Sequence, residues 1–236
     1  MREILEDAAV IYRQEVEGFL AAITPAAVLG PVLLIVASRG LTAALATIPF
    51  FLLLFLFTYA VCLESASAIL RNHGYQDSGR YLRLLRRLPD IIVAAAPAGL
   101  LLAAVSASGV VLGDQGFAYL SLVVALLGIV ATAHWALRHS FALPLVISYD
   151  LRGRDALEAS AQLADDIPQE TRSLVATVSL PLVVAGLLGA GLAAVSVPLA
   201  GAAVFLLALA AWLPFSALAL TGACVRLLDT SAQPAG

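Results

Sequence analysis

The chain has 236 residues, of which 61% are hydrophobic and only 12% are charged, and its net charge is −3 at pH 7. Soluble domains carry about 25% charged residues, so this composition excludes an ordinary soluble globular protein. The small negative charge also argues against a nucleic-acid partner, which would call for a basic surface.

Residues 1–19 predict an amphipathic helix at the membrane surface. Apolar side chains recur there at helical spacing, and charged side chains occupy the other positions. The apolar stripe consists of Leu5, Ala9, Tyr12, Val16 and Phe19. The alternative interpretation is a solvated lead-in to the first span that has no role of its own.

Apolar runs follow that are long enough to cross a bilayer, which takes about 20 residues. They predict six transmembrane helices, over residues 20–37, 41–63, 91–112, 117–140, 173–197 and 199–224. Continuous runs favour helices over the alternating strands of a barrel. Because the turns after the first, third and fifth spans are short, the spans are expected to form three antiparallel hairpins. The fold class is therefore an all-α integral membrane protein, with a transmembrane domain over residues 20–225 and a disordered tail over residues 226–236.

The first polar segment, residues 64–90, separates the first two hairpins. Its stretch DSGRYLRLLRRLPD predicts a second amphipathic helix on the cytoplasmic side, which Pro89 is expected to end. Arginines beside a span attract anionic headgroups. Four of them are therefore candidate contacts for anionic lipids or for a protein partner: Arg80, Arg83, Arg86 and Arg87. The plainer interpretation is that they only set the topology.

The second polar segment, residues 150–170, separates the second and third hairpins. The fourth span is expected to continue as one helix to about Tyr149, and a short helix is predicted over residues 156–166. All 13 basic residues are arginines, and every one except Arg39 lies near the N-terminus, in or beside the polar segments, or near the C-terminus. Cytoplasmic loops carry the excess of basic residues. This distribution predicts a protein of the cytoplasmic membrane with both termini in the cytoplasm.

One stretch resembles a known family. FALPLVI at residues 141–147, followed by a polar turn and by DALEAS at residues 155–160, resembles the hallmark segment of a loose, largely uncharacterised group of six-helix prokaryotic membrane proteins. That group is similar to the YciC-type proteins and to the membrane domain fused to some glycerophosphodiester phosphodiesterases. The resemblance implies a fold and a membrane location. It carries over no catalytic residue, because no phosphodiesterase domain is present here.

Ionisable groups inside membrane spans are costly and usually functional, and this chain has few. His134 and Arg138 share one helix face near the cytoplasmic end of the fourth span, and Glu64 ends the second span. These three residues are the candidate polar cluster, and a proton relay or an anion site is one interpretation of it. The other is an interfacial histidine beside Trp135, an arginine that reaches the headgroups, and a glutamate that pairs with an arginine as a structural tie.

The sequence contains no arrangement typical of an enzyme. It lacks a CxxC motif, metal-ligand spacing of cysteine and histidine, and a Gly-rich phosphate loop, so no cofactor or metal is expected. The leading hypothesis is a non-enzymatic polytopic membrane protein that acts as a scaffold, assembly factor or accessory subunit. Its expected partners are the lipid bilayer, anionic lipids in particular, and a membrane protein or a second copy of the chain. The alternative is a transporter or permease-like protein for an apolar or lipid-like substrate, and an intramembrane enzyme is a third hypothesis.

Overall fold

The structure of the chain, a computed structural model, describes residues 2–37, 39–71, 80–166, 172–178 and 198–231, and the regular elements in these ranges are helices. They are α1 (Arg2–Gln14), α2 (Val16–Ala37), α3 (Leu41–Leu70), α4 (Arg80–Asp114), α5 (Ala118–His139), α6 (Ala142–Tyr149), α7 (Gly153–Asp166) and α9 (Pro198–Ser231). Residues 172–178 are also helical. The predicted all-α class is confirmed for the described part of the chain.

Three of the described helices are long and apolar enough to cross a membrane, over Val16–Leu33 in α2, Leu45–Leu70 in α3 and Tyr81–Val105 in α4. Two further apolar segments, Tyr119–Gly128 and Trp212–Leu228, are shorter. Most of the predicted fifth span lies outside the described residues. The number of spans and their pairing in a membrane therefore remain predictions.

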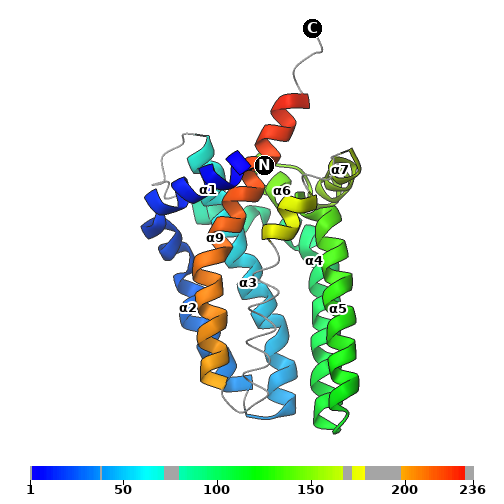
Figure 1. Cartoon of the computed structure of the whole chain (residues 1–236). Coiled ribbons are helices and arrows are strands. Elements are labelled where there is room, and N and C mark those ends of the chain that lie inside the picture. The colour runs from blue at the N-terminus through cyan, green and yellow to red at the C-terminus, as the bar shows by residue number, and fades with distance from the viewer. Residues whose placement is uncertain (1, 38, 72–79, 167–171, 179–197, 232–236) are drawn as a thin grey trace.

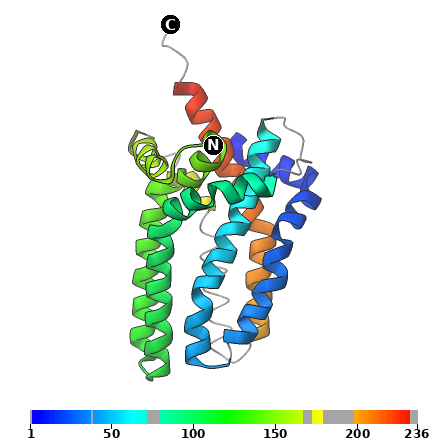
Figure 2. The same cartoon turned by 180° about the vertical axis from the view of Figure 1, so that it is seen from behind.

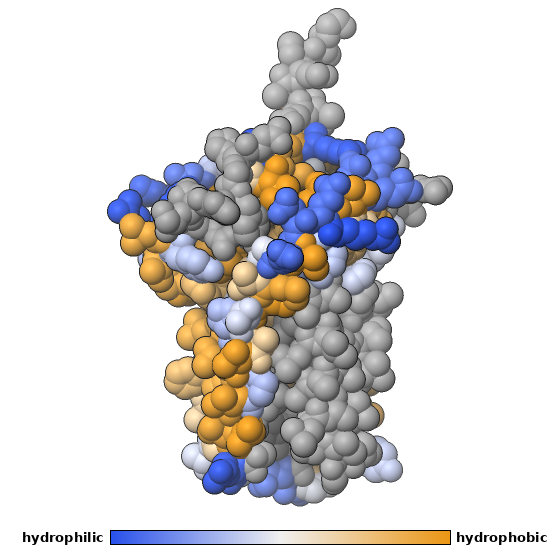
Figure 3. Space-filling model, turned by 90° about the vertical axis from the view of Figure 1, so that its left-hand side faces the viewer, coloured by the Kyte–Doolittle hydropathy of each residue, from blue (hydrophilic) through white to orange (hydrophobic). Residues whose placement is uncertain are grey.

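The long helices run along one another, and the short helices gather at one end of them. Helices α2, α3 and α9 lie side by side, and α4 and α5 form a second pair (Figure 1, Figure 2). We call the layer at this end the cap; it contains α1, α6 and α7 with the first turns of α4 and the C-terminal turns of α9. On the face shown in Figure 3, hydrophilic side chains gather at the cap and at the opposite tip, with hydrophobic ones between them. A bilayer core requires such an apolar band.

Two glycines shape the turns at the tip opposite the cap. Gly40, between α2 and α3, has a φ of +138°, and Gly116, between α4 and α5, has a φ of +80°. Residues with a side chain rarely adopt these values, whereas glycine does so readily. The short connections predicted at these two places therefore depend on glycine.

The centre of the core lies in the cap, around the short helix α6. Residues 141–147 are the stretch that carries the family resemblance, and most of their side chains are buried. Phe141 is fully buried, and Leu145, Val146 and Ile147 are at most 2% exposed. Helix α6 packs against α3, α4, α7 and α9. The motif therefore holds four other helices together, and its apolar character follows from that packing.

Pro89 does not end the amphipathic helix, so that prediction is wrong. Helix α4 continues through Pro89 and into the apolar segment as one element of 35 residues. An interior proline costs about 3 kcal/mol because it removes one backbone hydrogen bond and crowds the preceding turn. Leu84 and Ile91 lie on one face of α4 on either side of this proline, and both are only 1% exposed. Their burial offsets the cost.

The fourth span does not continue to Tyr149 as one helix. Helix α5 ends at His139, Ser140 and Phe141 form a turn, and α6 begins at Ala142. Pro144 accounts for the break, since its ring would collide with the Ser140 carbonyl in a continuous helix. In the structure Pro144 lies in the first turn of α6, where a proline is tolerated. The helix predicted over residues 156–166 is present as α7, which begins three residues earlier.

The chain ends also differ from the predictions. Helix α9 continues to Ser231, so residues 226–231 are helical where a disordered tail was predicted, and residues 232–236 lie outside the described part. The predicted N-terminal amphipathic helix forms as α1. Its stripe faces the protein, because Leu5 and Tyr12 pack against the core and Phe19, at the start of α2, is fully buried. Tertiary packing thus uses an apolar face that the sequence assigned to the membrane surface.

Candidate functional site

Glu64 forms an ion pair with Arg83. The Glu64 side chain, only 12% exposed, accepts hydrogen bonds from Nε of Arg83 at 3.2 Å and from Nη2 at 3.0 Å. Both bonds end on the same oxygen, Oε1, and charge-assisted hydrogen bonds are among the stronger ones in proteins. The ion pair ties the end of α3 to the start of α4. The predicted pairing of Glu64 with an arginine of a polar segment is therefore confirmed.

Arg87 is also used inside the cap. Its guanidinium donates to the Ile147 carbonyl oxygen and lies 2.9 Å from the Asp150 carboxylate. Asp150 ends α6 in the left-handed conformation, with a φ of 58°, which aspartate tolerates better than most residues. This turn presents its carboxylate to Arg87. The contact joins α4 to the end of α6.

The four arginines predicted to contact lipid or a partner thus have different environments. Arg83 and Arg87 serve as ties inside the cap. Arg86 is exposed and makes no ion pair with another described residue. Arg80 begins α4, and its side chain lies outside what the structure describes. Among the described side chains of this group, Arg86 is the one best placed to reach anionic headgroups.

Asp90 and Gly153 join α4 to the start of α7. The Gly153 amide donates to Oδ1 of Asp90 at 3.1 Å, so a carboxylate from another helix caps the first turn of α7. A Cβ at position 153 would lie 2.3 Å from the Asp90 carbonyl oxygen and 2.9 Å from Cβ of Val93. Only glycine permits so close an approach of α7 to α4.

Ser160 of α7 satisfies the backbone where α5 gives way to α6. Its fully buried hydroxyl accepts a hydrogen bond from the Phe141 amide at 3.2 Å and donates to the Arg138 carbonyl oxygen at 3.4 Å. A break in a helix leaves donors and acceptors without intrahelical partners, and burying them unpaired is costly. Ser160 therefore stabilises the break that Pro144 imposes.

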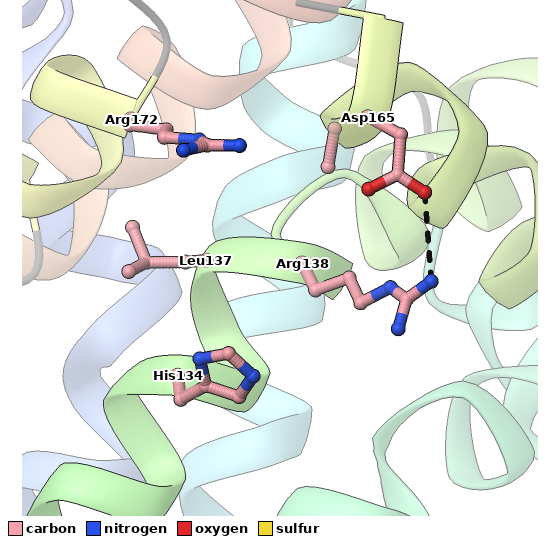
Figure 4. A pocket seen from close by; sticks show the side chains of 6 residues that line it. His134, Leu137, Arg138, Asp165 and Arg172 are labelled. Carbon is pink, nitrogen blue, oxygen red and sulfur yellow. Dashed lines mark hydrogen bonds and ion pairs between the residues drawn. The ribbon is translucent and has the colours of Figure 1, made fainter. Parts of the chain in front are cut away.

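An open pocket of about 340 Å³ lies at the cap end of α5. It is lined by His134, Leu137, Arg138, Ala164, Asp165 and Arg172 (Figure 4). His134 and Arg138 do share this pocket, as their spacing on one helix face predicted. Glu64 does not line it, so the predicted three-residue cluster is wrong in that member. The physical reason is that Glu64 belongs to α3, which contributes no lining residue, and pairs with Arg83 of α4.

Arg138 has one weak ionic partner in the pocket. Its Nη2 lies 3.5 Å from Oδ2 of Asp165, and both side chains are more than half exposed. Solvent-exposed pairs of this kind contribute about 0–1 kcal/mol. Sequence reasoning missed Asp165 and Arg172, because they come from segments far along the chain and no local pattern connects them to α5. Two guanidinium groups and an imidazole in an open pocket are suited to hold an anion.

Helix α1 is held against α9 by a third set of charges. Arg226 lies 3.3 Å from the Glu3 carboxylate and 2.6 Å from that of Asp7. Burial, and secondarily the Cys62 thiol, raises the pKa of the Tyr12 phenol on the inner face of α1. The described residues contain no group of three side chains able to hold a metal ion.

Comparison of the chain with protein-family models, with curated proteins and with solved structures finds no match.

Proposed function

We propose that the chain is a polytopic protein of the cytoplasmic membrane that acts without catalysis, as a scaffold, assembly factor or accessory subunit of a membrane complex. In this proposal six spans form three antiparallel hairpins, and both termini and the cap face the cytoplasm. The three helices of sufficient length and apolarity support the membrane placement. The placement of all arginines but Arg39 supports the orientation. The resemblance to six-helix prokaryotic membrane proteins is part of the same proposal.

The bare surface of α5 carries the scaffold hypothesis. Among the described elements, α5 has substantial contacts only with α4 and α7, and α7 meets it only at the cap. Tyr119, Leu122 and Leu126 follow one another along α5 at spacings of three and four residues and are 90%, 56% and 48% exposed. That spacing places them on one helix face. Such a face can receive a helix of a partner protein in the bilayer.

The ionic ties of the cap support the same reading. Glu64 with Arg83, and Asp150 with Arg87, fix α4 to α3 and to α6. The α4–α5 pair extends from the cap that these contacts join (Figure 1). A cap joined by ion pairs, next to a helix pair whose α5 face is exposed, suits a protein that positions another protein.

Purification from native membranes in mild detergent tests this proposal. We expect a protein partner, or a second copy of the chain, to co-elute in stoichiometric amount. The double variant Leu122→Phe/Leu126→Phe keeps the surface apolar but changes its shape, and we expect it to lose the partner. The matched control, Val28→Phe/Val32→Phe on the exposed face of α2, should retain it. Elution of the wild-type chain as a lone monomer would overturn the proposal.

A transporter or permease-like function for an apolar or lipid-like substrate is the second candidate. The pocket that joins His134 and Arg138 favours it. Purified protein in liposomes would then accelerate the transbilayer movement of a fluorescent phospholipid, and Arg138→Gln would abolish the acceleration. An unchanged rate relative to empty liposomes would reject this candidate and leave the scaffold proposal in place.

A further inference from the structure

We propose that the pocket at the cap end of α5 binds a phosphate group that carries one negative charge, such as the phosphodiester of a phospholipid headgroup. This goes beyond a scaffolding role, which requires no ligand. The lipid as the source of the phosphate rests on the proposed membrane placement. The phosphate chemistry rests only on the pocket itself.

Three segments of the chain bring the pocket together. His134, Leu137 and Arg138 come from α5, Ala164 and Asp165 from the last turns of α7, and Arg172 from the helical residues 172–178 (Figure 4). The cavity of about 340 Å³ is open to the surface, so a headgroup can enter it without a conformational change. Its position at the end of α5 next to the cap is where headgroups would lie in the proposed orientation.

The charges of the lining match a monoanion. Arg138 and Arg172 contribute two positive charges and Asp165 one negative charge, which leaves a single positive charge to be balanced. Arg172 makes no ion pair with another described residue. Arg138 is held by Asp165 only through a contact of 3.5 Å between exposed groups. Both guanidinium groups can therefore donate to phosphate oxygens, for which their planar fork is well suited.

The face of α5 that leads to the pocket suits an amphiphile. Val130, His134 and Arg138 follow one another at intervals of four residues and lie on one face of the helix. Val130 is 66% exposed, and Leu127 beside it is 65% exposed. The face thus changes from apolar to cationic at the end of α5. A phospholipid with its phosphate in the pocket would lay an acyl chain along the apolar part, which a free phosphate would leave uncovered.

Binding of phosphatidylglycerol to the purified full-length protein in mild detergent tests the proposal, with native mass spectrometry as the readout. We expect the double variant Arg138→Gln/Arg172→Gln to bind the lipid at least about tenfold more weakly, because it removes both charged donors. We expect Asp165→Asn to bind it about threefold or more tightly, since it removes the competing carboxylate.

Two matched controls change the same charges outside the pocket. Arg154 and Glu158 lie on α7 and are 86% and 69% exposed, and neither lines the cavity. Arg154→Gln and Glu158→Gln should leave lipid binding unchanged. The proposal is overturned if Arg138→Gln and Arg172→Gln, each made singly so that one charge is removed, bind the lipid as well as Arg154→Gln does, or if Asp165→Asn weakens binding. A general attraction of the cap for anionic lipid would produce the first of these results.

Competition identifies the source of the phosphate. Glycerophosphoglycerol, which carries the same monoanionic phosphodiester without acyl chains, should leave phosphatidylglycerol bound at millimolar concentration if the acyl chain contributes, and this result supports a lipid site. Displacement of the lipid that depends on Arg138 and Arg172 would assign the pocket to a soluble phosphate compound instead. Leu122 and Leu126 continue the face of α5 that carries Val130 and His134, so partner co-elution and lipid binding are measured on every variant. Loss of lipid binding with the partner retained leaves the scaffold proposal in place, and loss of the partner with lipid binding retained leaves the phosphate site in place, so the two failures are distinguishable.

Discussion

Replacement of Gly153 by alanine is expected to destabilise the cap. The added Cβ would lie 2.3 Å from the Asp90 carbonyl oxygen, a distance that real Cβ atoms do not show. Helix α7 would have to move about 1 Å away from α4 to reach ordinary contact. That movement would stretch the 3.1 Å hydrogen bond from the Gly153 amide to the Asp90 carboxylate. The substitution therefore perturbs packing and a helix cap together.

The magnitude follows from these two losses. Overpacking at a tight contact costs about 1–3 kcal/mol, and a hydrogen bond to a charged group contributes about 1.5–3 kcal/mol. Because one movement of α7 causes both losses, they overlap, and we expect a total of about 2–4 kcal/mol. For a chain of this size that corresponds to a fall in Tm of about 5–15 °C.

Gly99→Ala is the matched control. Gly99 lies in α4, and a Cβ there would meet no atom within 4 Å. Alanine in an exposed helix interior stabilises by about 0.5–1 kcal/mol relative to glycine. The same chemical change is thus expected to lower Tm at position 153 and to leave it unchanged or raise it at position 99.

Thermal unfolding of the purified chain in mild detergent, followed by tryptophan fluorescence, measures the difference. Trp135 is a local reporter, because its ring lies 4.8 Å from that of His139 at the cap end of α5. Equal Tm values for the two alanine variants would show that α7 does not approach α4 as described, and would refute the reasoning.

Three further predictions concern the cap and its orientation. Glu64→Gln should destabilise by about 1 kcal/mol because it removes the carboxylate charge that faces Arg83, whose side chain is 43% exposed. A thermal double-mutant cycle with Arg83→Gln should show positive coupling, and additive effects would contradict the tie. Ser160→Ala should cost about 1–3 kcal/mol in the same unfolding assay, since two backbone groups at the helix break lose their partner, and unchanged stability would argue against its role. An impermeant thiol reagent applied to intact cells tests the orientation: Gln115→Cys should react from outside, and Gln162→Cys should react only after permeabilisation. The two native cysteines are both buried and give little background. The reverse labelling pattern would invert the proposed topology.

Two prolines show where local sequence rules stop. Pro89 and Pro144 each follow a helical pattern, and the same steric argument applies to both. Pro89 lies inside a continuous helix, whereas Pro144 lies in the first turn of a new one. Burial of side chains on both sides of Pro89 holds α4 together, and the hydroxyl of Ser160 stabilises the break near Pro144. Ser160 is distant in sequence from Pro144, and α4 packs against separate helices, α3, α6 and α7. Neither outcome was therefore predictable from the residues next to each proline.

The sequence also predicted only some of the contacts in the candidate site. The shared face of His134 and Arg138 was predictable, because a spacing of four residues on a helix determines it. Asp165, 27 residues beyond Arg138, joins them only because α7 folds back against α5. That Glu64 would pair with some arginine was predictable from its charge beside an apolar span. That the partner is Arg83, which does not line the pocket, depends on how α3 meets α4.

By itself, the sequence determined the helical class, the approximate extent of most long helices and the positions of two short turns, because composition, periodicity and backbone sterics act over a few neighbouring residues. The tertiary structure alone decided that α1 faces the core, that the motif at residues 141–147 is a buried helix, and which charges pair within the cap. These outcomes depend on which surfaces exclude water together. Close packing and charge pairing join residues by distance in space, which a one-dimensional pattern does not encode.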